Sequence, residues 1–274
     1  MNRALAEPGL AKTCVIVNEF GAAGLDHLLV EGSANATEGV LELANGCACC
    51  AVRGDFLDTL LDVVEGDVGY DRIIVELSGL AEPGPILQAA MAHPVLQSKL
   101  STGGVICLVD AMAGLDALEN HHEAEEQLRF ADCVVLTKLD LVERTTQLRE
   151  RVLALASDVD VKDAMDIASI SSLLNDMATG GGLRSLSTGH HHHHHHDDGV
   201  ASICLRHDKP LSEHQVDLFL SLLTSAHGDH LLRIKGLVLL TDQPDMPLLV
   251  QGVGRHFAPP RRLESWRLPS KAAL

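Results

Sequence analysis

Short apolar runs alternate, along the first two thirds of the chain, with longer segments whose apolar residues recur at helical spacing. Four runs have the length and the β-branched content of buried strands: 13–17, 72–75, 104–109 and 133–136. Continuous apolar strands are typical of parallel sheets that are covered on both faces. Helices are predicted for the intervening segments 55–65, 124–131 and 143–155. The alternation predicts an α/β domain with a doubly wound, mostly parallel sheet.

The pattern changes after residue 177. Residues 178–199 are rich in Gly, Ser and His and carry no core-forming pattern, so we expect a flexible linker there. Further elements are predicted beyond it: strands at 200–205, 231–240 and 247–252, a helix at 212–223 and a turn at 242–245. The predicted organisation is therefore a first domain at 1–177, the linker, and a small α+β domain at 200–274.

Composition narrows the classes of partner. The net charge of −17 argues against nucleic acid or anionic lipid as the main partner and suits a protein that handles cations. There is no run of about 18 apolar residues and no signal peptide at the start, so we expect no membrane partner and a cytoplasmic location. The sequence leaves the oligomeric state open, a homo-oligomer included.

Three of the seven cysteines fall within four positions, at Cys47, Cys49 and Cys50. In a reducing compartment this clustering favours metal or thiol chemistry over a disulfide framework. Thiolates bind zinc at about 2.3 Å, and three from one loop leave a coordination position open. An incomplete ligand set suits a site that releases its metal. The spacing is not a standard structural zinc spacing, so a packed loop of ordinary cysteines and a redox pair remain alternatives.

A run of seven histidines lies in the predicted linker: His190, His191, His192, His193, His194, His195 and His196. Neutral imidazoles bind zinc, nickel and copper, and a pKa of about 6.5 leaves most of them able to ligate at neutral pH. A purification tag has the same composition, but tags normally stand at chain ends. The internal position therefore favours a natural, unselective metal-collecting loop.

Polar motifs follow two of the predicted strands. Glu76 and Gly79 end the second strand, where α/β nucleotide-binding domains place a magnesium-associated acid and a glycine that admits a phosphate. The fourth strand is followed by Thr137-Lys138-Leu139-Asp140, which resembles the guanine-reading motif Asn-Lys-x-Asp. In that motif the aspartate accepts from the ring N–H and the amine of guanine, and the lysine stem packs over the base. Alone, each motif also fits a strand followed by a polar turn.

In their order along the chain, these motifs resemble the CobW-like family of P-loop GTPases. The resemblance extends over the following segments: 17–21, 24–26, 45–50, 53–55, 76–83, 109–111, 127, 131–132, 137–141 and 232–236. It implies a P-loop GTPase-like fold and a zinc chaperone that hydrolyses GTP to GDP and phosphate.

The resemblance also implies roles for individual residues. The cysteine loop would hold zinc and pass it to a client metalloprotein, while the histidine tract and the last domain gather metal and help to choose the partner. Asn18, Glu19 and Asp26 would lie in the switch region that senses the γ-phosphate of GTP. Glu76 would lie near magnesium. The family often has Glu where this chain has Ala22, so one auxiliary metal ligand would be missing.

One family motif is absent from the 274 residues: no Gly-x-x-x-x-Gly-Lys-[Ser/Thr] occurs. That loop supplies the N–H groups, the lysine and the hydroxyl that hold phosphates and magnesium. We therefore expect weakened phosphate binding and the loss of the first strand from the sheet. Unpaired backbone groups on its neighbours would cost about 1–3 kcal/mol each if buried. A misplaced start codon or a fragmentary gene would explain the loss, with Met1 internal to a longer protein.

Three functions follow from these patterns. The first is a GTP-dependent zinc chaperone. The second is a zinc-binding or storage protein that acts without nucleotide, which the absent phosphate loop favours. The third is a thiol redox protein that uses Cys49 and Cys50, and it is the least favoured because adjacent cysteines seldom form unstrained disulfides.

Overall fold

A computed structural model describes residues 2–18, 40–42, 51–156, 159–179, 203, 205 and 207–263. The chain divides into two compact units. The first comprises Met1–Leu100 and Ile167–Asn175, and the second comprises Ser101–Asp166 and Asp176–Leu274. Each unit is built around its own parallel sheet, and the second also contains an antiparallel sheet.

The sheet of the first unit has three parallel strands in the order β2-β1-β3. The central strand β1 (Thr13–Asn18) pairs with β2 (Val40–Glu42) on one edge and with β3 (Arg72–Leu77) on the other. Consecutive residues of β1 from Cys14 to Val17 are at most 4% exposed, so both faces of the strand are covered. This burial explains why β1 reads as a continuous apolar run.

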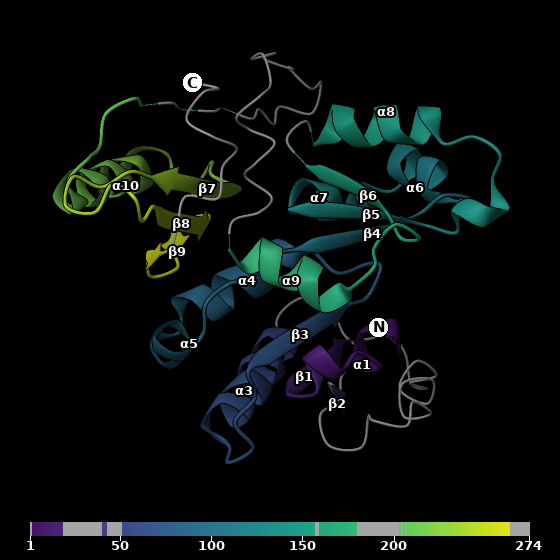
Figure 1. The fold of residues 1–274 in the computed structure, drawn as a ribbon, viewed down its shortest axis with the longest axis horizontal. Coiled ribbons are helices and arrows are strands. Elements are labelled where there is room, and N and C mark those ends of the chain that lie inside the picture. Colours follow the sequence, from purple (N-terminus) through teal and green to yellow (C-terminus); the bar gives the residue numbers. More distant parts are fainter. Residues whose placement is uncertain are drawn as a thin grey trace. The chain divides into compact units, whose positions relative to one another are not determined.

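Three helices follow the strands of the first unit: α3 (Ala51–Glu65), α4 (Pro83–Ala92) and α5 (Pro94–Lys99). Figure 1 shows α3 running beside β3. The core of the unit brings Cys14 and Ile16 of β1 together with Phe56 and Leu60 of α3 and with Leu96 of α5. The alternating residues Cys14 and Ile16 share one face of the strand, so these helices cover that face.

The amino-terminal segment of the first unit is α1 (Asn2–Leu5) and the short helix η1 (Pro8–Leu10), and between them lies Glu7. The Glu7 carboxylate accepts hydrogen bonds from the backbone N–H groups of Ile170 (2.6 Å) and Ser171 (2.9 Å), the first residues of α9 (Ile170–Ala178). These bonds satisfy N–H groups that have no partner within the helix, and they lower the pKa of Glu7. Residues more than 160 positions apart are joined in this way.

The parallel sheet of the second unit has the strand order β4-β5-β6. These strands are β4 (Ile106–Asp110), β5 (Cys133–Thr137) and β6 (Asp160–Asp163). Its helices are α6 (Gly114–Asn120), α7 (His122–Arg129) and α8 (Thr146–Leu155), with a short helix η2 (Leu139–Leu141) after β5 (Figure 1). Val134 and Leu136 of β5 share a core with Leu128 of α7 and Val152 of α8, so the helices cover one face of this sheet.

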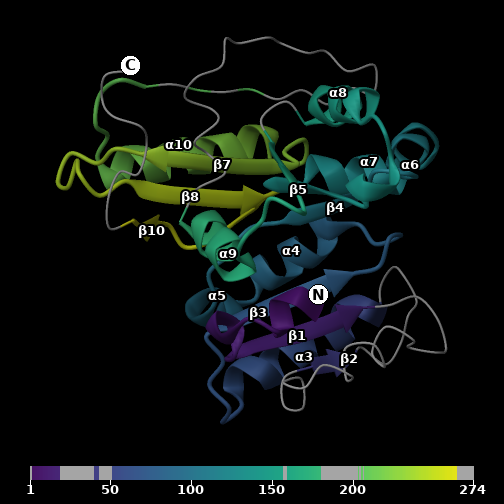
Figure 2. The same cartoon turned by 45° about the vertical axis from the view of Figure 1, so that its right-hand side comes forward.

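The carboxyl-terminal part of the second unit is an α+β layer (Figure 2). It contains α10 (Glu213–His227), β7 (Arg233–Val238), β8 (Leu248–Val253), β9 (His256–Phe257) and β10 (Arg261–Arg262). The strands are antiparallel in the order β10-β8-β7, and β9 also pairs with β8. Ser212 and Gln215 form a capping box that begins α10, and Val216 of this helix packs against Leu248 and Val250 of β8.

The predicted fold class, an α/β domain with parallel strands plus a small α+β domain, is confirmed. Helix α8 begins three residues later than predicted, at Thr146, because Val142 ends η2 in an extended conformation. Of the strand predicted at 200–205, only Ile203 and Leu205 are described, and neither lies in a strand. Among the described residues the parallel strands pair in two sets of three, and β3 and β4 each pair with one strand. The boundaries 1–177, 178–199 and 200–274 remain predictions.

None of the helices in the described part of the chain combines the length and the apolar character needed to cross a membrane.

A buried ionic cluster joins β5 to β7 within the second unit. Asp132, immediately before β5, is 8% exposed. Its Oδ1 accepts a hydrogen bond from Lys235 Nζ at 2.8 Å, and its Oδ2 forms an ion pair with Arg233. Oδ2 also accepts from the backbone N–H of Val105 at 2.8 Å. The carboxylate is thus bonded on both oxygens, and it ties the parallel sheet to the antiparallel sheet.

Burial alone would raise the pKa of Asp132, but the charges of Arg233 and Lys235 outweigh it and hold the pKa below its ordinary value. Gly104 permits this arrangement, since its φ of +143° is a conformation that other residues rarely adopt. A Cβ at this position would lie 3.0 Å from Asp132 Oδ2 and 2.8 Å from Met177 Cε. The glycine therefore lets the chain pass close to the buried carboxylate.

We predict that Asp132→Asn destabilises the protein by about 3 kcal/mol or more at pH 7, because it leaves two buried cations without an anion. Asp160→Asn is the control: its ion pair with Lys162 (2.7 Å) involves side chains about 40% exposed, so we expect a loss below about 1 kcal/mol. Urea unfolding monitored by circular dichroism measures both. Equal losses for the two variants would contradict the prediction.

The same cluster predicts a pH dependence. A carboxyl group with a lowered pKa stabilises the fold above its ordinary pKa, which is 3.8 for Asp132, and the stabilisation is lost as the pH falls through the lower pKa of the folded state. The difference in the free energy of unfolding between the wild type and Asp132→Asn should therefore become smaller as the pH is lowered below 3.8.

Candidate functional site

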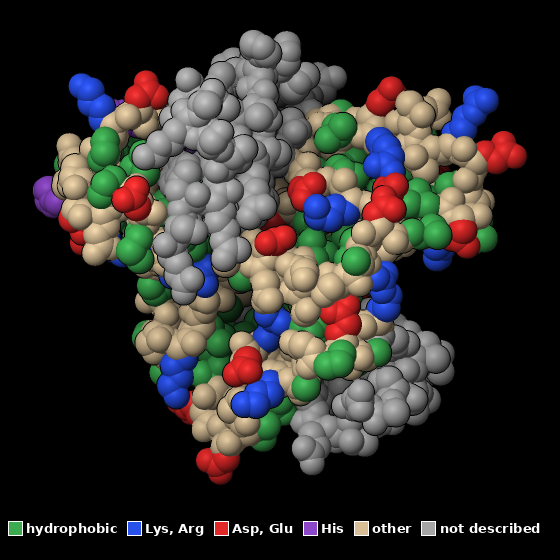
Figure 3. Space-filling view, in the orientation of Figure 1, with side chains coloured by type: hydrophobic (Ala, Val, Ile, Leu, Met, Phe, Trp, Pro, Cys, Tyr) green, Lys and Arg blue, Asp and Glu red, His purple; other side chains and the backbone are tan. Residues whose placement is uncertain are grey.

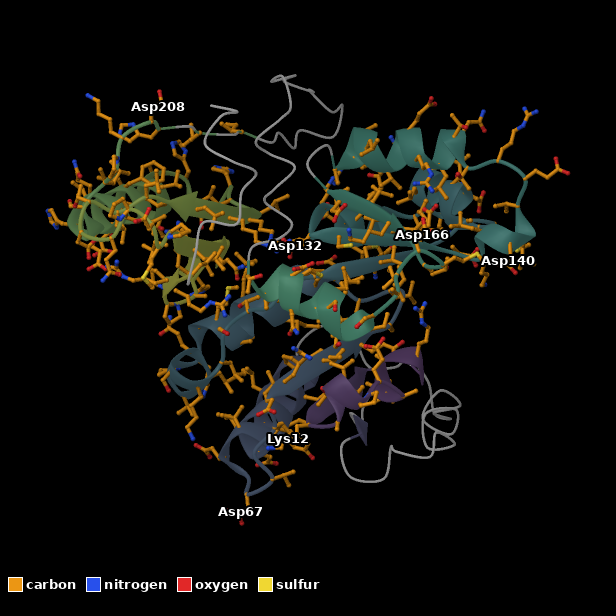
Figure 4. The ribbon with its side chains drawn as sticks, in the orientation of Figure 1. Lys12, Asp67, Asp132, Asp140, Asp166 and Asp208 are labelled. Carbon is orange, nitrogen blue, oxygen red and sulfur yellow. The ribbon has the colours of Figure 1, made fainter. Side chains whose placement is uncertain are left out.

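The carboxyl ends of β4, β5 and β6 place polar groups at one edge of the parallel sheet of the second unit. Asp110, the last residue of β4, pairs in register with Thr137, the last residue of β5. Asp163, the last residue of β6, pairs with Leu136. In Figure 4, the labelled Asp140 and Asp166 lie at this end of the strands and Asp132 lies at the other. The parallel register therefore gathers residues from three distant segments of the sequence.

Hydrogen bonds fix the loops that leave this edge. The hydroxyl of Thr137 donates to the Val109 carbonyl at 3.3 Å, and the Ala111 N–H donates to the Thr137 carbonyl at 2.9 Å. On the other side, the Ala164 N–H donates to the Leu136 carbonyl at 2.9 Å. The loops after β4 and β6 are thus held against the end of β5. Thr137, which replaces the usual Asn of the guanine-reading motif, has a structural use for its hydroxyl here.

Lys138 is restrained at both its backbone and its side chain. Its φ of 56° is the one positive φ of a non-glycine residue within the described part of the chain. Its Nζ forms an ion pair with Asp110 Oδ2 at 2.5 Å, although 56% of the lysine side chain is exposed. The hydrogen bonds from Lys138 and from the Met112 N–H lower the pKa of Asp110. The lysine stem therefore has a defined place at the edge of the sheet.

Asp140 lies in η2 and is exposed. Among the described residues its carboxylate forms no ion pair, whereas Asp163 at the same edge is paired with Arg149. Asp140 therefore offers both carboxylate oxygens to a ligand that carries two adjacent N–H donors.

Acidic and basic side chains of the described residues are interspersed on the face of the molecule drawn in Figure 3.

The first unit carries the other predicted nucleotide residues that are described. Asn18, the last residue of β1, pairs with Leu77, and Val17 pairs with Glu76. Glu76 is half-buried at the carboxyl end of β3. A Cβ at Gly79, just beyond this strand, would meet no atom of the described residues within 4 Å. The structure brings the ends of β1 and β3 together, as the parallel strands predict.

Two of the predicted switch residues and all of the predicted metal residues are not placed by the structure. Glu19, Asp26, Cys47, Cys49, Cys50 and the tract from His190 to His196 lie outside the described residues. Within the described ranges, no group of three or more His, Cys, Asp or Glu residues is arranged to hold a metal ion. The cysteine loop and the histidine tract therefore remain predictions as metal sites.

Three cysteines are described, and all of them are unsuited to metal binding. Cys14 and Cys133 are buried in the two sheets, and Cys107 is partly buried in β4. Burial raises the pKa of Cys14 and raises the pKa values of Cys107 and Cys133 to about 11. A thiol with so high a pKa stays protonated at neutral pH, and the protonated form is a poor metal ligand and a poor nucleophile.

Two features of the site escaped prediction from the sequence. Asp110 and Asp132 both belong to segments that carry the family resemblance, yet no pattern indicated their partners. The pairing of Asp110 with Lys138 spans 28 positions, and that of Asp132 with Arg233 spans 101. A signal for the first was present, since an aspartate that ends one strand is expected to lie beside the end of the neighbouring parallel strand.

Comparisons with known proteins agree with this arrangement. Residues 1–165 match the profile of the CobW/HypB/UreG nucleotide-binding domain, and residues 200–273 match the carboxyl-terminal domain of the cobalamin synthesis protein CobW. The chain is 30% identical to the zinc chaperone YjiA of Escherichia coli over 255 residues, which are 90% of this chain and 79% of that protein. It is 31% identical to the zinc chaperone CobW of Pseudomonas aeruginosa, with 90% of this chain and 74% of that protein covered.

Solved structures show the same fold. The crystal structure of Zn(II)-bound YjiA GTPase from Escherichia coli superposes with a TM-score of 0.57 and 22% sequence identity. The superposition covers 96% of this chain and 91% of that chain.

We predict that N-ethylmaleimide at pH 7.5 leaves Cys14, Cys107 and Cys133 unmodified in the folded protein. At a pKa of about 11, only about 0.03% of a thiol is ionised at this pH. Mass spectrometry of peptides identifies the labelled positions, and the same reaction in urea, where all cysteines should react, is the control. Rapid labelling of Cys107 or Cys133 in the native protein would contradict the prediction.

Proposed function

The chain belongs to the CobW/HypB/UreG family of nucleotide-binding proteins, and on that basis we propose that it is a GTP-dependent zinc chaperone. In this proposal the loop with Cys47, Cys49 and Cys50 holds zinc. Hydrolysis of GTP to GDP and phosphate drives transfer of the zinc to a client metalloprotein in the cytoplasm. The names of the relatives, zinc chaperones in two bacteria, support the choice of metal.

The observation that carries the nucleotide part of the proposal is the end of β5. Thr137 and Lys138 are fixed there by bonds to β4, and Asp140 beside them is exposed. Guanine presents a ring N–H and an exocyclic amine side by side, and a carboxylate accepts from both. Adenine presents an acceptor in place of that ring N–H, so the same carboxylate disfavours ATP. The lysine stem supplies an apolar surface over the base.

A separate group of residues is proposed to act on the phosphates and on magnesium. Glu76 is proposed to lie near magnesium, because a carboxylate at a strand end together with phosphate oxygens is a usual magnesium ligand set. Gly79 has no Cβ, so a phosphate oxygen can approach its backbone closely. Asn18, Glu19 and Asp26 are proposed to sense the γ-phosphate and so to report the state of the nucleotide.

The metal part of the proposal rests on chemistry and on connectivity. Three thiolates leave one zinc position open, which permits hand-over of the ion to a ligand of the client. The described elements on either side of the cysteine loop are β2, which ends at Glu42, and α3, which begins at Ala51. Both belong to the unit that contains Glu76. The proposed metal ligands are thus joined along the chain to elements of the unit that contains Glu76. The histidine tract is proposed to collect zinc from solution.

A second candidate is a zinc-binding or storage protein that works without nucleotide. It would use only the two predicted metal-binding segments, the loop with Cys47, Cys49 and Cys50 and the histidine tract, neither of which needs a nucleotide to bind zinc. Titration of the purified chain with zinc, GTP and ATP separates the candidates. Binding of both zinc and GTP, with hydrolysis stimulated by zinc, supports the chaperone. Binding of zinc without GTP supports the storage protein.

We predict that Asp140→Asn weakens GTP binding at least tenfold, because an amide presents a donor where guanine also presents one. Xanthosine triphosphate has a carbonyl in place of the amine. The Asp140→Asn variant should therefore lose less affinity for this nucleotide than for GTP, or should bind it more tightly than the wild type does. Glu143→Gln is the matched control, since it removes one exposed acid three residues away. Isothermal titration with the three nucleotides gives the affinities. If the GTP preference over ATP is unchanged, Asp140 does not read the base.

We predict that Cys49→Ser lowers zinc affinity at least tenfold in a chain from which residues 190–196 are deleted. A serine hydroxyl stays protonated and cannot replace a thiolate at a zinc ion. Competition with a chromophoric zinc chelator measures the affinity, and Cys107→Ser is the control because that thiol is partly buried in β4. Unchanged affinity for Cys49→Ser in this background excludes the cysteine loop as the main site.

A further inference from the structure

An ion pair joins the ends of the adjacent strands β4 and β5. Both oxygens of the Asp110 carboxylate are engaged: Oδ2 pairs with Lys138 Nζ at 2.5 Å, and Oδ1 accepts from the Met112 N–H at 2.8 Å. The second bond fixes the carboxylate to its own turn. The ammonium of Lys138 is therefore held at a defined point of the sheet edge, although most of the lysine side chain is exposed.

The backbone of Lys138 supports the same arrangement. Its left-handed conformation is unfavourable for a residue with a Cβ, yet hydrogen bonds on both sides of it keep the chain there. The Ala111 N–H donates to the carbonyl of Thr137, and the Leu141 N–H donates to that of Lys138. The structure thus specifies both where the lysine side chain starts and where it ends.

The ion pair between Asp110 and Lys138 also affects Asp140. Asp140 is two residues from Lys138, and an unrestrained lysine ammonium could pair with its carboxylate. Asp110 binds that ammonium instead, and within the described residues Asp140 has no ion-pair partner. The carboxylate proposed to read guanine is in this way kept available for the N–H donors of the base.

We propose that Asp110 is a positioning residue for guanine recognition. It fixes the position of Lys138 so that the lysine stem can pack over the base, and it holds the ammonium group of Lys138 away from Asp140. This inference rests on the proposed function, since it assigns a determinant of affinity and selectivity to the same site. A lysine that is already anchored loses less conformational freedom when a ligand packs against its stem, so binding is tighter.

The test is a double-mutant cycle with fluorescent GDP and with ATP as competitor. Asp110→Asn should weaken guanine nucleotide binding about three- to tenfold and should lower the preference for GTP over ATP. Lys138→Met keeps the length and the apolar character of the stem and removes the charge. In the Lys138→Met background, Asp110→Asn should have no further effect on either quantity.

Two further variants separate positioning from general damage to the fold. Asp160→Asn removes an ion pair of similar exposure at the opposite end of β6 and should leave nucleotide affinity unchanged. Asp110→Glu retains the carboxylate and should recover part of the selectivity. Thermal unfolding of each variant, compared with that of Asp160→Asn, identifies any loss of structure.

The outcomes distinguish this inference from the proposed function. An Asp110→Asn protein that binds as the wild type does, while Asp140→Asn loses guanine selectivity, overturns the inference alone. An equal effect of Asp110→Asn with and without the lysine charge also overturns it, since Asp110 then acts by another route. A wild type that binds zinc but shows no preference for GTP over ATP overturns the nucleotide part of the proposed function and the inference with it.

Discussion

The candidate site of the second unit depends on the register of β5 between its two neighbours. A buried parallel strand must bond its backbone groups on both edges, and Cys133 to Leu136 are at most 4% exposed. The register that satisfies those groups places Thr137 opposite Asp110 and Leu136 opposite Asp163. A slip by one residue would exchange the two faces of β5, so Val134 and Leu136 would leave the core that they share with α7 and α8. It would also separate Lys138 from Asp110. The packing of the core therefore determines which polar side chains meet at the edge of the sheet.

Two ionic clusters lie at opposite ends of β5, and their burial gives them different tasks. Asp132 is buried with Arg233 and Lys235, and removing one partner of such a cluster costs about 3–5 kcal/mol. The pair of Asp110 with Lys138 is partly exposed, so water screens both charges and the pair contributes little to the stability of the fold. The first cluster therefore suits a permanent link between the parallel and antiparallel sheets. The second is weak enough to respond to a ligand, and its value lies in where it holds the lysine.

The sequence predicted what depends on local pattern. The apolar runs of β1, β3 and β5 were predicted because burial on both faces leaves a continuous signal, and Asp140 became a candidate because its motif follows such a run. Strand β2 escaped notice because its three residues, Val40–Glu42, are too few to form a pattern. Pro83 and Pro94, at the first positions of α4 and α5, were available signals of helix starts. The partners of Asp132 could not be predicted, since these pairings depend on tertiary contacts between distant segments, whereas the position of Asp110 at the end of a parallel strand was an available signal for its pairing.

In the proposed function, nucleotide binding and zinc binding are coupled in one protein. The most direct measurement is the zinc affinity of the purified chain, by chelator competition, with GDP and with a non-hydrolysable GTP analogue in the presence of magnesium. We expect zinc affinities that differ at least about fivefold between the two nucleotide states, with a reciprocal change of the same factor in nucleotide affinity. Equal zinc affinities with both nucleotides bound would contradict it.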